Sequence, residues 1–159
     1  SLNENGPECY CGNRGCFELY CEKAHIIERL KNLLANPSGC SIFRTLVAEN
    51  HGQVSLDTPF QAFRMGSIQV QEILLDVATY LGRAMLMIRN ILDPDCIILS
   101  GDLVTVDPYV LQTALAFMRE RVPIRTRNEP SIRTAKLPPN KFETSVCLYT
   151  FENMLDQII

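Results

Sequence analysis

Three cysteines lie close together near the start of the chain, where Cys9, Cys11 and Cys16 fall within eight residues. Gly12 and Gly15 separate them and allow the tight backbone turns that point three thiols at one centre. Zinc favours soft, convergent thiolates of this kind, and closed structural zinc sites are built from Cys and His. We therefore predict that Cys9, Cys11 and Cys16 are ligands of a structural zinc ion.

Three thiolates do not complete a tetrahedral site, and the residues alone leave its fourth ligand open. Cys21 and His25 lie in the helix expected to follow, and a residue upstream of Ser1 is the third candidate. The alternative to a metal site is a surface turn with three reduced cysteines. A disulfide framework is the weaker interpretation, because the chain holds seven cysteines and three of them lie in apolar segments typical of a core, Cys40, Cys96 and Cys147.

The composition limits the class of protein. The 159 residues are 47% hydrophobic, which suits one domain or half of a two-lobed one. The formal charge of -3 lacks the basic excess of a nucleic-acid-binding surface. We see no signal peptide and no apolar run of membrane-spanning length, so we expect a cytoplasmic protein with no membrane partner. The lack of an initiating Met leads us to expect a fragment.

Helical periodicity defines the elements that must position the cysteines. The strongest pattern runs from Ser67 to Leu92, with apolar residues every three or four positions, and predicts a long, mostly buried helix. Similar patterns and capping signals predict further helices over residues 18–34, 41–50, 60–64 (after a start signal at 57–59), 107–121 and 144–158.

One apolar run has the length of a strand. Cys96 to Leu99 predicts a central strand covered on both faces, and a second strand is expected over 132–137. Ser100-Gly101-Asp102 then turns the chain at the carboxyl end of the first strand, which is the edge where open α/β sheets usually bind ligands.

Two stretches resemble the ROK family, named for repressors, open reading frames and kinases. The first is Asn5-Gly-Pro-Glu-Cys-Tyr-Cys-Gly-Asn-Arg-Gly-Cys-Phe-Glu18, which is similar to the zinc signature of that family. The second comprises Leu81-Gly-Arg-Ala84 and Asn90-Ile-Leu-Asp-Pro-Asp-Cys-Ile-Ile-Leu-Ser-Gly101, which resembles the family's helix, turn and apolar strand. Together they cover most of residues 5–105.

The resemblance implies a fold and a domain organisation. ROK proteins have two α/β lobes of the actin-like ATPase, ribonuclease H-like kind, which bind a sugar between them and commonly form dimers or tetramers. The chain would then be one such lobe, with a zinc-binding loop at residues 1–17 (the Cys loop) and a helix-rich insertion within the α/β lobe of residues 18–159. The family's fourth zinc ligand is a His that would lie upstream of Ser1.

Glu18 matches the family's motif glutamate, so the resemblance implies that it contacts a sugar hydroxyl. Without the motif, an acidic residue in a first helical turn is explained by the helix dipole. His25 and His51 have no such support. The resemblance assigns no catalytic residue to this chain, because the family's catalytic Asp belongs to the other lobe.

The turn after the strand separates the two branches of the family. ROK kinases typically have a glycine run there, which lets the backbone approach ATP phosphates, whereas this chain has only Gly101 followed by Asp102. A carboxylate beside phosphates is unfavourable without a metal. Gly101 is thus a nucleotide-binding residue only under the kinase alternative. Thr144-Ser145-Val146 likewise departs from the family's small-residue pair near the last helix.

We therefore interpret the chain as the carboxyl-terminal effector-sensing and oligomerising region of a transcriptional regulator of the NagC/Mlc-like repressor branch. Its expected partners are a sugar or phosphosugar and other copies of itself, with DNA bound only by an amino-terminal domain elsewhere. The first alternative is the carboxyl lobe of an ATP-dependent sugar kinase, inactive as this fragment. The second is a zinc-stabilised interaction module without a small ligand, in which the apolar end over 148–159 contacts another lobe or subunit.

Overall fold

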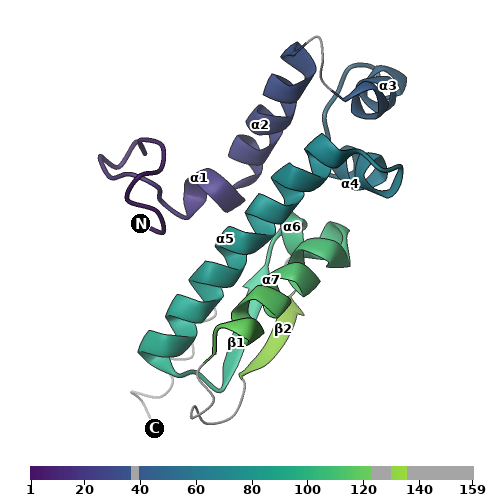
Figure 1. The fold of residues 1–159 in the computed structure, drawn as a ribbon. Helices are drawn as coiled ribbons and strands as arrows, with labels where there is room; N and C mark the ends of the chain where they lie inside the picture. The colour runs from purple at the N-terminus through teal and green to yellow at the C-terminus, as the bar shows by residue number, and fades with distance from the viewer. Residues whose placement is uncertain (37–39, 123–129, 136–159) are drawn as a thin grey trace, which may run out of the picture.

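The computed structural model describes residues 1–36, 40–122 and 130–135. Within them, a loop at the amino terminus leads into a set of helices arranged around one long central helix, with two strands beside it (Figure 1). The elements follow in this order: α1 (Glu18–Cys21), α2 (Lys23–Ala35), α3 (Ser41–Glu49), α4 (Asp57–Arg64), α5 (Ile68–Leu92), β1 (Cys96–Ser100), α6 (Asp102–Val106), α7 (Pro108–Glu120) and β2 (Ser131–Ala135).

The central helix α5 confirms the strongest periodicity in the sequence. Ser67 caps its amino terminus by accepting a hydrogen bond from the Val70 amide at 3.3 Å, and Asp93 ends it in the left-handed conformation. Its apolar face packs most extensively on α7 and contributes many of the buried side chains of the core. The core members on α5 are Val70, Leu74, Val77, Ala78, Leu81 and Met85.

The single helix predicted over residues 18–34 is wrong, because the chain forms α1 and α2 with a break at Glu22, whose backbone is extended at ψ 137°. Tyr20 and Ile26 are both buried. Six residues apart on a straight helix, they would point roughly 120° apart around its axis. The break lets both helices contact α5 and bury both side chains.

The predicted helices over 41–50 and 60–64 are confirmed as α3 and α4, the latter beginning at Asp57. Cys40 precedes α3, and its sulfur accepts a hydrogen bond from the Phe43 amide at 3.3 Å. The same sulfur lies 2.7 Å from the Ser67 hydroxyl at the start of α5. Cys40 is buried, which confirms that it belongs to the core.

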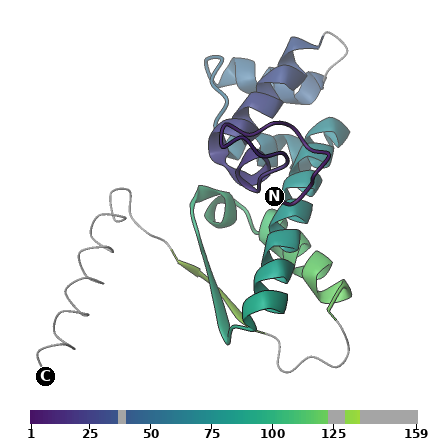
Figure 2. The same cartoon turned by 90° about the vertical axis from the view of Figure 1, so that its left-hand side faces the viewer.

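The two strands are parallel, with Ile97 of β1 paired with Ile132 of β2. Figure 2 shows them on one side of α5 and α7. The prediction that β1 is covered on both faces is wrong for the described residues: Ile97 is 7% exposed, whereas Ile98 on the opposite face is 65% exposed. The helices that the structure describes cover one face only. The second strand is confirmed in part, since residues 136 and 137 lie outside the described residues.

Helix α7 confirms the prediction over 107–121. Asp107 caps it by accepting a hydrogen bond from the Tyr109 amide at 2.8 Å, and its carboxylate also pairs with Arg64 at the end of α4. The short helix α6 was not predicted, because one turn is too short to show a periodic pattern. The predicted helix over 144–158, Thr144-Ser145-Val146 and Cys147 lie outside the described residues.

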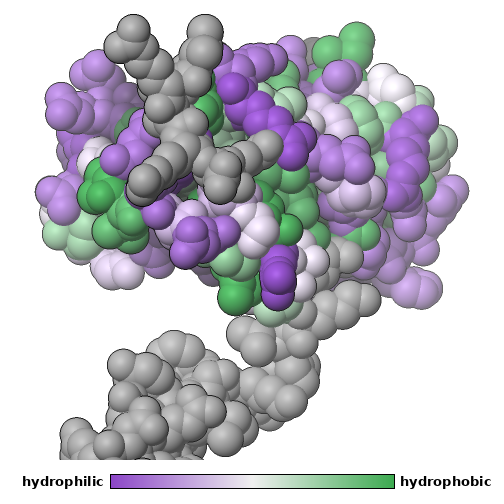
Figure 3. Space-filling view, turned by 90° about the horizontal axis from the view of Figure 1, so that it is seen from below, coloured by the Kyte–Doolittle hydropathy of each residue, from purple (hydrophilic) through white to green (hydrophobic). Residues whose placement is uncertain are grey.

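An apolar surface remains at the end of the molecule where α5 ends and β1 begins. Figure 3 views the molecule from this side and shows hydrophobic patches between hydrophilic rims. A groove of about 440 Å³ lies here between α5, Leu2, Phe17 and Leu99. The most exposed large hydrophobic side chains of α5 at this end are those of Ile91 and Leu92, at 74% and 70%. Among the described residues, no helix combines the length and apolar character required to cross a membrane.

Candidate functional site

The Cys loop is held in shape by backbone hydrogen bonds. The Cys9 amide donates to the Asn13 oxygen at 2.8 Å, and the Gly15 amide donates to the Pro7 oxygen at 2.8 Å. Glu8 and Arg14 form an antiparallel bridge, and their side chains form an ion pair at 2.5 Å. Because the chain doubles back on itself, cysteines separated along the sequence are brought to the same end of the loop.

The three predicted metal ligands do converge. The sulfur atoms of Cys9, Cys11 and Cys16 all lie within 4.8 Å of one another, and those of Cys11 and Cys16 are 3.5 Å apart. Zn–S bonds of about 2.3 Å place the sulfurs of a tetrahedral site about 3.8 Å apart. The spacing and donor type therefore fit a zinc ion, and a metal ion at this position would be reached from solvent on the side of the exposed Cys11.

The free thiols of the loop are unequal in acidity. Hydrogen bonds from the Asn13 backbone and from the thiols of Cys16 and Cys9 lower the pKa of Cys11 to about 7. The hydrogen bond with Cys11, together with burial, raises the pKa of Cys16 to about 11. The loop thus stabilises one thiolate readily and resists forming a second one beside it, unless a cation compensates the charge.

Two of the candidates for the fourth ligand are wrong. Among the described residues, neither Cys21 nor His25 joins the group formed by the three cysteines. The Cys21 thiol points into the protein and donates to the Val77 oxygen at 3.6 Å, and burial raises its pKa to about 12. The His25 ring lies between Glu22 and Glu28, at 4.0 and 3.8 Å. A ligand from upstream of Ser1 stays a prediction.

Glu18 begins α1 directly after the Cys loop. Its carboxylate lies near the Tyr10 hydroxyl, and this interaction raises the pKa of Tyr10. Glu18 is only half-buried, while Tyr10 is 83% exposed. The carboxylate is therefore accessible and is held at the junction of loop and helix, where it is able to accept hydrogen bonds from a ligand. No pattern in the sequence distinguishes Tyr10, which lies between Cys9 and Cys11.

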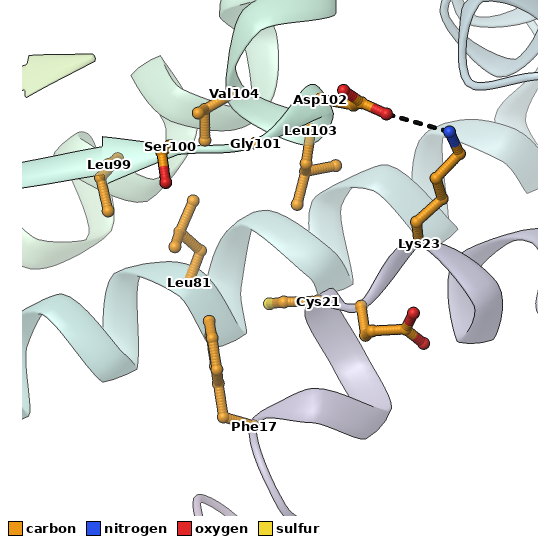
Figure 4. A pocket seen from close by; sticks show the side chains of 11 residues that line it. Phe17, Cys21, Lys23, Leu81, Leu99, Ser100, Gly101, Asp102, Leu103 and Val104 are labelled. Atoms are coloured by element: carbon orange, nitrogen blue, oxygen red, sulfur yellow. Dashed lines mark hydrogen bonds and ion pairs between the residues drawn. The ribbon is translucent and has the colours of Figure 1, made fainter. Parts of the chain in front are cut away.

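A cavity of about 360 Å³ lies at the carboxyl end of β1, beside α1. Figure 4 shows the apolar side chains of Phe17, Leu81 and Leu103 around it and the turn at Gly101 along its upper edge. Phe17 and Cys21 line this cavity, and they flank Glu18 in sequence. The predicted ligand-binding edge of the sheet is thus a hollow in the structure, next to the element that carries Glu18.

An ion pair spans the rim of this cavity. Lys23 at the start of α2 donates to the Asp102 carboxylate at 2.9 Å, and both side chains are more than half exposed (Figure 4). Gly101 precedes Asp102 with φ 110°, in the region that favours glycine. Sequence reasoning missed Lys23, because the two residues are 79 positions apart and Lys23 has the pattern of a solvated helix face.

Comparison with known proteins gives consistent matches. A family model described as ROK family matches residues 1–141. The chain is 24% identical to the xylose repressor of Bacillus spizizenii over 156 residues, 98% of this chain and 36% of the repressor. It is 31% identical to the DNA-binding transcriptional repressor Mlc of Escherichia coli over 99 residues, 62% of this chain and 22% of Mlc. The chain spans about a third or less of these relatives.

Solved structures share the fold. A ROK family glucokinase from Streptomyces griseus, in complex with glucose and AMPPNP, aligns with a TM-score of 0.65 at 20% identity, covering 82% of this chain and 43% of the kinase. A ROK family transcriptional regulator, a homologue of the Escherichia coli Mlc protein, aligns with a TM-score of 0.63 at 19% identity. The alignment covers 84% of this chain and 32% of the regulator. The fold is therefore one that these kinases and regulators share.

The cysteine signature, the long helix leading into an apolar strand, and the match over residues 1–141 agree with one another. This chain belongs to the ROK family.

Proposed function

We propose that the chain is the carboxyl-terminal effector-sensing region of a ROK transcriptional regulator that responds to a sugar. Three curated relatives support a regulator rather than an enzyme, since they are named as the xylose repressor, Mlc and NagC. Operator binding and oligomerisation then belong to the whole protein, and this region contributes the effector site. An effector shifts operator affinity only by binding the two states of the regulator with different affinity.

The observation that carries this proposal is the convergence of the three cysteine sulfurs within 4.8 Å, immediately before α1. In the proposed mechanism, Cys9, Cys11 and Cys16 hold a structural zinc ion. These three thiolates would hold the ion by metal–sulfur bonds in place of the weak thiol hydrogen bonds of the loop, and the ion would offset most of their negative charge. Glu18 follows Cys16 by two residues, so fixing Cys16 fixes the start of α1 and the position of the carboxylate.

The proposed role of Glu18 is to accept a hydrogen bond from a sugar hydroxyl. An ionised carboxylate is acceptor-only, which suits a ligand rich in hydroxyl donors. The Tyr10 phenol lies near the Glu18 carboxylate, so a ligand would either displace this phenol or retain it as a second contact. The adjacent cavity, with its apolar wall and the Lys23–Asp102 pair on its rim, offers space for the rest of a monosaccharide.

Calorimetric titration of the full-length protein tests the proposal. The ligands are xylose, glucose and N-acetylglucosamine, each as the free sugar and where possible as the phosphate, because relatives and neighbours carry these names. We expect one sugar to bind and to weaken operator binding. Glu18→Gln should lower that affinity about tenfold, since hydrogen bonds to charged groups contribute about 1.5–3 kcal/mol. Glu28→Gln, an exposed carboxylate on α2, is the matched control and should bind like the wild type.

Absence of binding to every sugar, with operator binding intact, would contradict sugar sensing and favour the zinc-stabilised interaction module. A Glu18→Gln variant that binds as tightly as wild type would contradict the role of that residue only. The two parts of the proposal are therefore tested separately.

One observation favours the kinase alternative, namely the shared fold with ROK kinases. Gly101 would then approach the nucleotide phosphates, and Lys23 would offset the charge of Asp102 beside them. The test is ATP-dependent phosphorylation of the same sugars by the full-length protein, together with nucleotide binding. Phosphorylation without operator binding would contradict the proposal of a regulator and support the kinase alternative.

A further inference from the structure

Two tyrosines on different helices stack face to face beneath the Cys loop. Tyr20 of α1 and Tyr80 of α5 have ring centroids 3.5 Å apart and planes inclined by only 11°. Both residues are buried, at 7% and 8% exposure. The Arg83 guanidinium lies 5.0 Å from the Tyr80 ring centroid on the same helix. Each ring shields the other from solvent, so this buried pair packs α1 against α5.

The side chain of Asn3 joins both rings to the amino-terminal segment. Its amide nitrogen donates to the Tyr80 hydroxyl at 3.1 Å and lies 3.4 Å from the Tyr20 hydroxyl. Its amide oxygen accepts from the Asn5 backbone at 3.1 Å, which fixes the orientation of the amide. A residue three positions from the start of the chain thereby contacts a helix 77 residues away.

The backbone around Asn3 also holds the end of the Cys loop. The amides of Leu2 and Asn3 both donate to the Gly15 oxygen, at 2.8 and 3.3 Å. Gly15 has φ 58°, and a Cβ there would collide with the Asn3 backbone oxygen. A Cβ on Gly6 would collide with the Tyr20 hydroxyl. The segment is thus in close contact with the tyrosines on one side and with the residue before Cys16 on the other.

We propose that Asn3 and Tyr80 are positioning residues for the metal site, which they hold in register with α5. Asn3 fixes Gly15, Gly15 precedes the ligand Cys16, and the hydroxyl of Tyr80 fixes Asn3. This inference rests on the proposed metal site. Neither Asn3 nor Tyr80 is among the proposed ligands, so their effect on the metal site would be indirect.

The coupling works in both directions, because linkage between two equilibria is reciprocal. Metal binding restrains Cys16 and therefore Asn3, and this stabilises the contact of Asn3 with the stacked rings. Leu81, the neighbour of Tyr80 on α5, lines the cavity at the end of β1. The tyrosine pair thus connects the Cys loop to the wall of the cavity that we propose as the binding site of the effector.

The test measures zinc affinity by competition with a chromogenic chelator in the intact protein. Tyr80→Phe keeps the stacked ring and removes the hydroxyl that Asn3 contacts. Loss of one hydrogen bond predicts about fivefold weaker zinc binding. Asn3→Ala should weaken it by a similar or larger factor. In the double variant the two effects should fall short of additive, because both changes remove the same interaction.

Tyr109→Phe is the matched control. It removes one phenol hydroxyl elsewhere, from a ring that packs on Phe63 at 4.3 Å. Its zinc affinity should equal that of the wild type. Thermal unfolding of each metal-free variant shows whether a loss of affinity reflects unfolding, and Tyr80→Phe should unfold within a few degrees of the wild type.

Tyrosine circular dichroism supplies the second measurement. The 159 residues contain no Trp, so the near-ultraviolet signal of this region comes largely from its tyrosines. Chelation of zinc should change this signal in the wild type and change it much less in Asn3→Ala. Equal zinc affinity in wild type, Tyr80→Phe and Asn3→Ala would overturn the positioning role while leaving the metal site intact. Failure of the wild type to bind zinc would overturn both.

Discussion

The Cys loop and the interface of α5 with α7 represent two different ways of ordering a chain. In the interface, order comes from burial: Val77 on α5 and Ala114 on α7 are fully inaccessible to solvent. In the loop, only Cys9 of the three cysteines is buried, and the backbone is held by hydrogen bonds and the Glu8–Arg14 pair. The interface needs apolar side chains of the right volume, whereas the loop needs particular donor atoms in particular places.

The largest contrast we expect is in thiol reactivity. In protein freed of metal, iodoacetamide at pH 7 should modify Cys11 about a thousandfold faster than Cys21. With pKa values of about 7 and about 12, the thiolate fraction differs greatly, and the lower intrinsic nucleophilicity of Cys11 offsets only part of this. Burial slows Cys21 further. Peptide mass mapping over time measures both rates, and similar rates would show that the loop and the core do not differ in this way.

The next largest effect is on stability. Leu74→Ala empties a buried position on α5 and should lower the free energy of unfolding by about 2–5 kcal/mol. Leu75→Ala, the adjacent residue with 45% exposure, is the matched control and should cost about 1 kcal/mol or less. Urea unfolding measures both. Zinc affinity of the folded Leu74→Ala protein should be unchanged, and a parallel loss would mean that the two regions are one cooperative unit.

Cys11→Ser alters the Cys loop and leaves the core unchanged, which is the converse of Leu74→Ala. Replacing one proposed ligand should weaken zinc binding by about a hundredfold, because hydroxyl oxygen is a poor substitute for thiolate sulfur. Unfolding of the metal-free protein should change by less than about 1 kcal/mol, since Cys11 is exposed. Cys96→Ser, outside the loop, is the control and should retain wild-type affinity. A large loss of metal-free stability in Cys11→Ser would show that the loop contributes to the core after all.

The smallest effect belongs to the ion pair at the rim of the cavity. Lys23→Ala should change the free energy of unfolding by no more than about 0.5 kcal/mol, because Lys23 and Asp102 are both largely exposed. A double-mutant cycle with Asp102→Asn measures the interaction itself. A coupling energy above about 1 kcal/mol would show that this pair contributes to stability as much as a buried interaction does.

The sequence was sufficient to predict a structural element wherever a single local pattern specifies that element. The apolar repeat over α5 and the apolar run of β1 each predict their element directly. The three cysteines likewise predict their own convergence, since their spacing and the intervening glycines constrain the loop.

Prediction failed where the outcome depends on contacts between distant segments. The break at Glu22 has no Pro or Gly to signal it and follows from the need to bury both Tyr20 and Ile26 against α5. Cys21 has suitable spacing for a metal ligand, yet its thiol donates a hydrogen bond to the Val77 oxygen of α5. Periodicity and spacing describe single segments, so neither reveals which surface a segment meets.

The exposed side of β1 has a practical consequence for handling the molecule. Ile98 presents an apolar side chain on a strand, and Ile91 and Leu92 lie exposed near the end of α5. Strands with accessible apolar faces are sites of unwanted self-association, and large apolar patches lower solubility. We expect the 159-residue chain on its own to aggregate as its concentration rises, and a charge introduced by Ile98→Lys to delay that aggregation.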